Sequence, residues 1–291
     1  MRGEGKCWLC GRWAKLTREH IPPRSAFNDR PLLLYEMERN SADVGRMAWA
    51  ERRENGLIVV SLCGECNSWC GGQYGSHFVE FIRKIAEPVE KARDGGQIFV
   101  AGIQRPLSVL KAITQSFVSA NGPAFVGATP WVRKFLRNSR NREWPTDTYL
   151  YVFATNSRGG RKSGVSGFYD IPLRRTHVVA EFTFWPLGTV LSFGWELNDP
   201  RLAPIHHWSH YDYGHQGTVD LRLTVNPVAT AYPLDFRNTD QVYREAQDAG
   251  ASPLASRSDV EDLAKRVTER SGETDKETWR LMVRQMPRLS E

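Results

Sequence analysis

The chain has 291 residues, of which 41% are hydrophobic and 25% are charged, and its formal net charge is +6. This composition is ordinary for globular proteins, so it excludes a chain too polar to form a core and allows one large or two modest domains. The mild positive charge permits a polyanionic partner without requiring one.

The N-terminal stretch MRGEGKCWLC is charged and glycine-rich, where a secretory signal would have an apolar segment. No apolar run approaches the roughly 18 residues needed to cross a bilayer. We therefore expect a cytoplasmic protein that has no membrane partner.

The first elements in chain order alternate between cysteine-containing turns and short strands. Residues 1–23 predict a Cys-x-x-Cys turn and a strand, and the pair Pro22-Pro23 excludes a helix there. Residues 24–56 are polar and arginine-rich, and we interpret them as an insertion with some helix. The β-branched run 57–62 predicts a strand. From about Gly75, apolar residues at helical spacing predict a helix.

Later segments divide into helical and β-rich parts. Residues 97–141 are expected to be mainly helical. From Asp147, short aromatic and β-branched runs broken by Gly, Pro and Asn predict an antiparallel sheet. After about Phe236, two capping-box patterns predict short helices. The expected class is α+β, and the expected units are an N-terminal metal-binding module, a helical basic connector, an antiparallel β-rich subdomain and C-terminal helices, at residues 1–95, 96–144, 145–238 and 239–291.

The cysteines favour a metal site over disulfides. All five fall in the first quarter of the chain, as the pairs Cys7–Cys10 and Cys63–Cys66 and a single Cys70. Four thiolates on two tight turns complete a tetrahedral zinc shell, and a closed shell is structural because it leaves no position for substrate. The alternatives are two unrelated reduced pairs or a redox motif, although no βαβ pattern surrounds either pair. We interpret Cys70 as a free thiol.

The motifs CWLCG, LTREHIPP and SLCGECN, in this order, resemble those of the HNH nucleases over residues 5 to about 85. The resemblance implies a ββα-metal finger held together by a zinc knuckle pair. It also implies that His20 is the general base, and that Glu19 and Asn67 are ligands of a catalytic divalent ion. Where that family has a middle Asn, this chain has Ile58, so the resemblance requires a longer loop or another residue to orient His20.

The same roles follow from the chemistry of phosphodiester hydrolysis. A neutral histidine can take a proton from water near pH 7. A hard cation such as Mg²⁺ or Mn²⁺, held by a carboxylate and an amide oxygen, neutralises charge on the phosphate. Cysteines prefer a softer metal, so the module would bind zinc for structure and a second ion for catalysis.

Several other residues are candidates of lesser weight. His77 lies near the start of the expected helix and is either a further metal ligand or a plain helix-start histidine. The histidines of segment 206–216 are a second metal site, a nucleic-acid surface or part of a loop over the sheet. Nucleic-acid contacts, with a solvated face as the alternative, are expected from Arg52, Arg53, Arg133, Lys134 and Arg137.

The sequence thus predicts a metal-dependent HNH-type endonuclease, and the resemblance favours DNA over RNA as substrate. The alternative is a zinc-containing module that binds nucleic acid or protein and does not catalyse a reaction.

Overall fold

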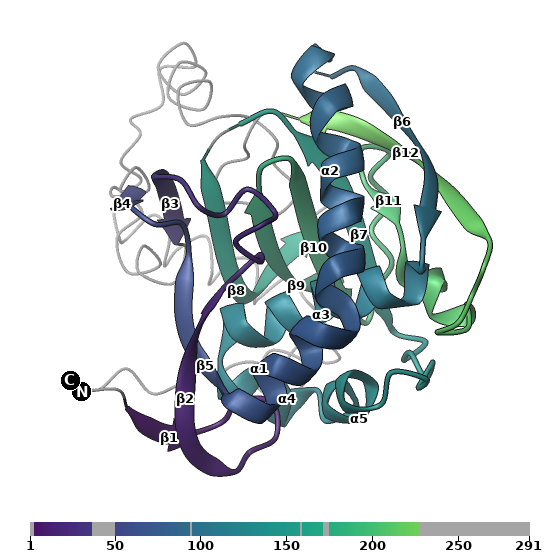
Figure 1. The fold of residues 1–291 in the computed structure, drawn as a ribbon. Helices are drawn as coiled ribbons and strands as arrows, with labels where there is room; N and C mark the ends of the chain where they lie inside the picture. The colour runs from purple at the N-terminus through teal and green to yellow at the C-terminus, as the bar shows by residue number, and fades with distance from the viewer. Residues whose placement is uncertain (1–2, 37–49, 94, 158, 171–174, 227–291) are drawn as a thin grey trace, which may run out of the picture.

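The structure is a computed structural model that describes residues 3–36, 50–93, 95–157, 159–170 and 175–226 (Figure 1). It consists of a small sheet, a large sheet and helices between them, so the expected α+β class is confirmed. The helices expected at 239–291 lie outside the described residues. No helix in the described part of the chain is long and apolar enough to cross a membrane.

The small sheet has three antiparallel strands in the order β1 (Glu4–Lys6), β2 (Trp13–His20) and β5 (Ile58–Cys63). Thr17 pairs with Leu62 and Arg18 pairs with Val60, which leaves Ser61 as a bulge in β5. The Cys7–Cys10 turn joins β1 to β2, and β5 ends at the second cysteine pair. This arrangement brings residues that are about 50 positions apart in the sequence to one end of the sheet.

Three helical segments follow β5 without a break. They are α1 (Gly64–Cys70), a π-helical turn η2 (Gly71–Gly75) and α2 (Ser76–Lys91). The helix expected from about Gly75 is therefore present. Its buried stripe contains the residues that gave the helical spacing, namely Phe78, Phe81, Ile82, Ile85 and Val89.

The large sheet follows the order β4-β3-β8-β9-β10-β7-β12-β6, and the short β11 (Ala203–Pro204) pairs with β7. Most neighbours are antiparallel, whereas β3 with β8 and β12 with β7 are parallel. The expected β-rich region supplies the central strands, which are β7 (Thr148–Thr155), β8 (Gly160–Asp170), β9 (Arg175–Phe184), β10 (Leu187–Phe193) and β12 (Thr218–Asn226).

Two segments differ from expectation because they join this sheet. The described parts of the 24–56 insertion form β3 (Leu32–Glu36) and β4 (Ala50–Arg53), which pair with each other and extend the sheet beside β8. The region expected to be mainly helical begins with β6 (Gln97–Gln104), where Ile98 and Val100 are buried and their neighbours are exposed. The expected boundaries at residues 95 and 145 therefore cross one sheet.

The helices after β6 are α3 (Pro106–Asn121), α4 (Pro123–Ala128) and α5 (Trp131–Arg137). Helices α2 and α3 lie in front of the large sheet in Figure 1. Side chains from both helices and from β9 line one shared apolar region, among them Phe78, Ile82, Ile113, Phe182 and Phe184. Helix α3 is buried on nearly all sides, so it forms the centre of the molecule between the two sheets.

Candidate metal centre and active site

The two Cys-x-x-Cys turns meet at the end of the small sheet. The sulfurs of Cys7, Cys10, Cys63 and Cys66 all lie within 4.8 Å of one another, and Cys10 Sγ is 3.9 Å from Cys63 Sγ. With Zn–S bonds of about 2.3 Å, sulfurs at the corners of a tetrahedron are about 3.8 Å apart. The four cysteines are thus placed to bind a metal such as zinc, and the expected clustering is confirmed.

In the absence of a metal, the electrostatics of the cluster favour one thiolate, at Cys7, because burial raises the pKa of Cys63 and the hydrogen bond with Cys7 raises the pKa of Cys66. Hydrogen bonding by the Cys66 thiol and by nearby backbone groups lowers the pKa of Cys7 to about 4, against the opposing effect of burial. The backbone N–H of Cys63 also donates to Cys7 Sγ over 3.3 Å. In contrast, burial raises the pKa of Cys70 to about 12, so this thiol stays protonated and inert, as expected for a residue outside the cluster.

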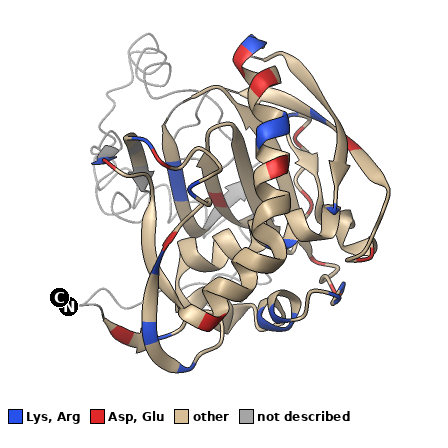
Figure 2. Ribbon diagram, in the orientation of Figure 1, with Lys and Arg blue, Asp and Glu red and all other residues tan. Residues whose placement is uncertain are grey.

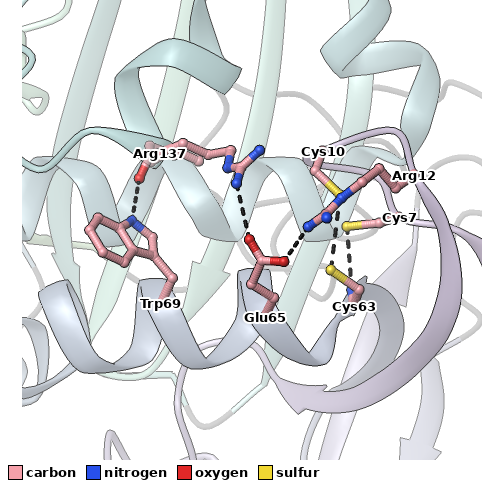
Figure 3. A network of polar contacts seen from close by, with 8 residues as sticks. Cys7, Cys10, Arg12, Cys63, Glu65, Trp69 and Arg137 are labelled. Atoms are coloured by element: carbon pink, nitrogen blue, oxygen red, sulfur yellow. Dashed lines mark hydrogen bonds and ion pairs between the residues drawn. The ribbon is translucent and has the colours of Figure 1, made fainter.

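An exposed network of charges lies beside the cysteines (Figure 3). The carboxylate of Glu65 on α1 pairs with Arg12 in the first cysteine turn and, over 3.1 Å, with Arg137 on α5. Trp69 Nε1 donates to the carbonyl of Leu136 over 3.0 Å. These contacts connect α1 to the first cysteine turn and to α5.

His20, the predicted general base, is half-buried at the end of β2. Its Nδ1 lies 3.0 Å from the backbone carbonyl of Asn28. Because a carbonyl can only accept, Nδ1 carries the proton in this contact, and Nε2 of the neutral ring keeps its lone pair. The contact with Asn28 therefore fixes the orientation of the His20 ring.

Asn28 is itself fixed by three hydrogen bonds and is fully buried. Its Nδ2 donates to the carbonyls of Pro22 (2.7 Å) and Leu57 (3.0 Å), and its Oδ1 accepts from the N–H of Leu57 (2.7 Å). It thus ties the loop after β2 to the start of β5. Sequence reasoning missed Asn28 because its partners are backbone groups 6 and 29 residues away.

Glu19, the predicted metal ligand, lies inside the protein. It is 5% exposed, and its carboxylate accepts hydrogen bonds from Ser61, from Ser119 Oγ (2.8 Å) and from Gln115 Nε2 (2.9 Å). Burial raises its pKa to about 7. The two α3 donors could not be recognised from the sequence, since they are about 100 residues away from Glu19.

Asn67, the second predicted ligand, lies in α1 beside a different part of β2. Its Nδ2 donates to Thr17 Oγ1 over 3.1 Å. Thr17 precedes His20 by three residues, which is about 10 Å along a strand, and the neighbours Glu19 and His20 point to opposite sides of it. The contacts of Glu19, His20 and Asn67 do not bring the three side chains to one point. Although their oxygens suit a hard cation, the arrangement does not fit a shared ion.

The remaining histidines form no metal site in the described part of the chain. There, the four cysteines are the only set of three or more His, Cys, Asp or Glu ligand atoms close enough to share an ion. His77 is half-buried at the start of α2, and burial lowers its pKa. His206 and His207 lie in the 3₁₀ turn His206–His210 beside β7, where burial also lowers their pKa values.

The predicted nucleic-acid contacts are mostly engaged within the chain. Arg133 Nε donates to the carbonyl of Leu9 over 2.8 Å, and Arg137 pairs with Glu65. Two further residues form exposed ion pairs, Arg52 with Glu54 and Lys134 with Glu143, and Arg53 also has a partner. Such pairs are weak enough in water to exchange for a phosphate.

Comparison of the chain with protein-family models, with curated proteins and with solved structures found no match in any of the three. The likeness to the HNH nucleases therefore stays a prediction from the sequence motifs.

Proposed function

We propose that this protein is an HNH-type endonuclease that hydrolyses phosphodiester bonds of nucleic acid, with His20 as the general base. The observation that carries the proposal is the contact of His20 Nδ1 with the carbonyl of Asn28. The buried side chain of Asn28 bonds to the backbone of Pro22 and Leu57, so the Asn28 carbonyl is fixed where it can orient the imidazole, as a general base requires.

In the proposed reaction, Nε2 of His20 takes a proton from a water molecule that attacks phosphorus. The other proton stays on Nδ1, where it is hydrogen-bonded to the Asn28 carbonyl. This hydrogen bond stabilises the imidazolium that forms. A metal bound by the four cysteines would hold the turn before β2 and the end of β5 together. They thereby support the strand that carries the base.

The proposal retains a requirement for Mg²⁺ or Mn²⁺ and a preference for DNA over RNA, both of which come from the sequence resemblance. A divalent ion would neutralise charge on the phosphate and the leaving oxygen. Glu19 and Asn67 do not form a site for this ion, because Glu19 bonds to Gln115 and Asn67 bonds to Thr17.

The test is incubation of zinc-loaded protein with supercoiled plasmid and Mg²⁺ or Mn²⁺, beside His20→Ala. We expect nicking or linearisation by the wild type and a loss of at least about 100-fold in His20→Ala, the usual contribution of general-base catalysis. His77→Ala is the matched control, since it removes a half-buried histidine from the same module. Equal cleavage by wild type and His20→Ala would contradict the proposal.

The second candidate is a module that binds nucleic acid or protein without catalysis. The enclosure of Glu19 by Ser61, Ser119 and Gln115 favours it, because a carboxylate committed to structure cannot also serve an ion freely. Under this candidate, neither wild type nor His20→Ala cleaves any nucleic acid with either ion.

A further inference from the structure

The side of β2 that carries His20 also carries Arg18. Side chains alternate along a strand, and the bulge of the small sheet lies in β5, so residues two apart on β2 share a side. Arg18 is exposed and pairs across the sheet with Val60, which is 45% exposed. Lys15 is also exposed, but the alternation puts it on the opposite side of the strand, with Glu19. Arg18 is therefore the cation of β2 that lies on the side of the proposed base.

The guanidinium of Arg18 is available to a ligand. In the part of the chain that the structure describes, its side chain makes no hydrogen bond or ion pair. Arg133 and Arg137, in contrast, are engaged by Leu9 and Glu65. Figure 2 shows Lys and Arg residues along β2 at an edge of the molecule away from the large sheet, so a long polyanion can reach this strand. Arg18 can contact a phosphate without first giving up a partner in the described part of the protein.

The separation of Arg18 from His20 suits a phosphate and its attacking water. Two residues along a strand span about 6.7 Å. A general base lies about 3 Å from the water that it deprotonates, and in a reactive complex that water lies about 3–3.5 Å from the atom it attacks. These two distances together cover about the same length. A phosphate whose water contacts His20 would therefore lie beside Arg18.

A phosphate in this position needs a cation. Negative charge is spread over its oxygens as the water attacks, and enzymes stabilise that charge with Arg, Lys or a metal ion. Glu19 and Asn67 do not form a shared site for such an ion, because they bond to Gln115 and Thr17. A guanidinium at Arg18 suits the task, since it stays protonated and can donate two parallel hydrogen bonds to one phosphate.

We propose that Arg18 binds the scissile phosphate beside His20 and stabilises the negative charge that develops on it during hydrolysis. The guanidinium keeps its protons throughout. The water forms a bond to phosphorus and gives a proton to His20, the bond from phosphorus to the leaving oxygen breaks, and that oxygen takes a proton from the solvent, to which His20 later returns its own. This inference rests on the proposed function and adds to it the residue that binds the phosphate.

The first measurement is the single-turnover rate of plasmid nicking at saturating protein, which reads the reaction of bound substrate. Arg18→Ala should lower this rate by about 100-fold or more, because the developing charge loses a donor. Arg18→Lys should lower it by only about tenfold, since lysine keeps the charge but not the paired donors. Lys15→Ala is the matched control, an exposed cation of the same strand on its opposite side, and should keep the wild-type rate. Arg24→Ala removes another exposed arginine near His20, in the loop after β2, and should also keep it.

The second measurement is the salt dependence of binding, by fluorescence anisotropy of a fluorescein-labelled DNA duplex. Every protein carries His20→Ala, so that binding is read without cleavage. Adding Arg18→Ala should reduce the slope of log affinity against log salt by about 0.9, the value for one phosphate contact with B-form DNA. Adding Lys15→Ala should leave the slope unchanged. Because both side chains are exposed, the circular dichroism spectra should match that of the wild type.

The outcomes separate this inference from the proposed function. If cleavage depends on His20 but Arg18→Ala cleaves as fast as Lys15→Ala, the Arg18 proposal is overturned and the nuclease stands. A loss of rate in Arg24→Ala rather than in Arg18→Ala has the same meaning. If no protein cleaves but the salt slope depends on Arg18, the nuclease proposal fails and Arg18 remains a phosphate-binding residue. If the protein neither cleaves nor binds the duplex, both proposals are overturned.

Discussion

The small and large sheets are stabilised in different ways. Along β2 in the small sheet, only Glu19 is fully buried, whereas seven of the eight residues of β7 in the large sheet are. Three short strands with one solvated face bury too little apolar surface for stability of their own. The four sulfurs at the end of the small sheet can supply the difference through a metal, because binding energy to a structural ion becomes folding energy.

The largest expected effect comes from removing one sulfur. Cys63→Ser should abolish metal binding and unfold the small sheet, since structural zinc sites contribute on the order of 10 kcal/mol. The strands of the large sheet should stay protected. Elemental analysis gives the metal content, and hydrogen exchange resolved by segment gives the protection of β2 and β5 against that of β7 and β10.

Cys70→Ala is the matched control, because Cys70 is equally buried and lies four residues past Cys66 but outside the cluster. It should keep one metal per chain. If Cys63→Ser retained the metal, or if the wild type contained none, the small sheet would not depend on these four sulfurs and a metal for its stability.

The second effect concerns the contact that fixes α5 to α3. Lys111 is fully buried, and its Nζ donates to the carbonyls of Phe135, Asn138 (3.1 Å) and Asn141 (2.7 Å). Lys111→Met keeps the length of the side chain but leaves these carbonyls without their donor, so we expect a loss of about 3–4 kcal/mol in the free energy of unfolding. Lys134→Met, an exposed lysine of α5, should change it by less than about 0.5 kcal/mol. Urea denaturation measures both.

The pH dependence of Lys111 has a definite sign. Burial lowers its pKa in the folded state to about 7, from 10.5. Between these values the unfolded chain holds a proton that the folded chain has released, so stability rises with pH in this window and the contribution is lost as pH falls through 7. The stability difference between wild type and Lys111→Met should therefore grow from pH 7 to 9.5. An unchanged difference would show that Lys111 stays charged.

The features that the sequence could predict are those that depend on local patterns. The cysteine spacing and the stripe of α2 are local patterns, and both appear as expected. The alternation of Ile98 and Val100 is also typical of a strand. Because the longer helical pattern of α3 follows directly, the whole region was expected to be mainly helical. Asn28, Lys111 and the donors to Glu19 carried no signal, because each acts through groups that only the folded chain brings near.

A third test concerns the loop that carries the carbonyl for His20. Gly56 has φ +73°, and a Cβ there would lie 2.0 Å from Asn28 Oδ1. Gly56→Ala should therefore displace Asn28, lower the free energy of unfolding by about 2–3 kcal/mol and reduce any cleavage activity. Gly95→Ala is the control, since Gly95 has φ +75° but nothing within 4 Å of the added carbon. It should cost about 1 kcal/mol from backbone strain alone. If Gly56→Ala and Gly95→Ala lowered the melting temperature equally, Asn28 would not be tightly packed against Gly56.

The smallest expected effect is that of the charges around the metal centre. Glu65 joins Arg12 in the first cysteine turn to Arg137 on α5, so it links the small sheet to the helices (Figure 3). All three side chains are largely exposed, and water and salt screen such pairs. Glu65→Gln should therefore leave the metal content unchanged and shift the melting temperature by no more than about 2 °C. Increasing the salt concentration should make the shift smaller still. A large shift, or loss of the metal, would mean that charge pairing joins the small sheet to the helices. Sulfur coordination and apolar packing would then not be the main source of stability of the small sheet.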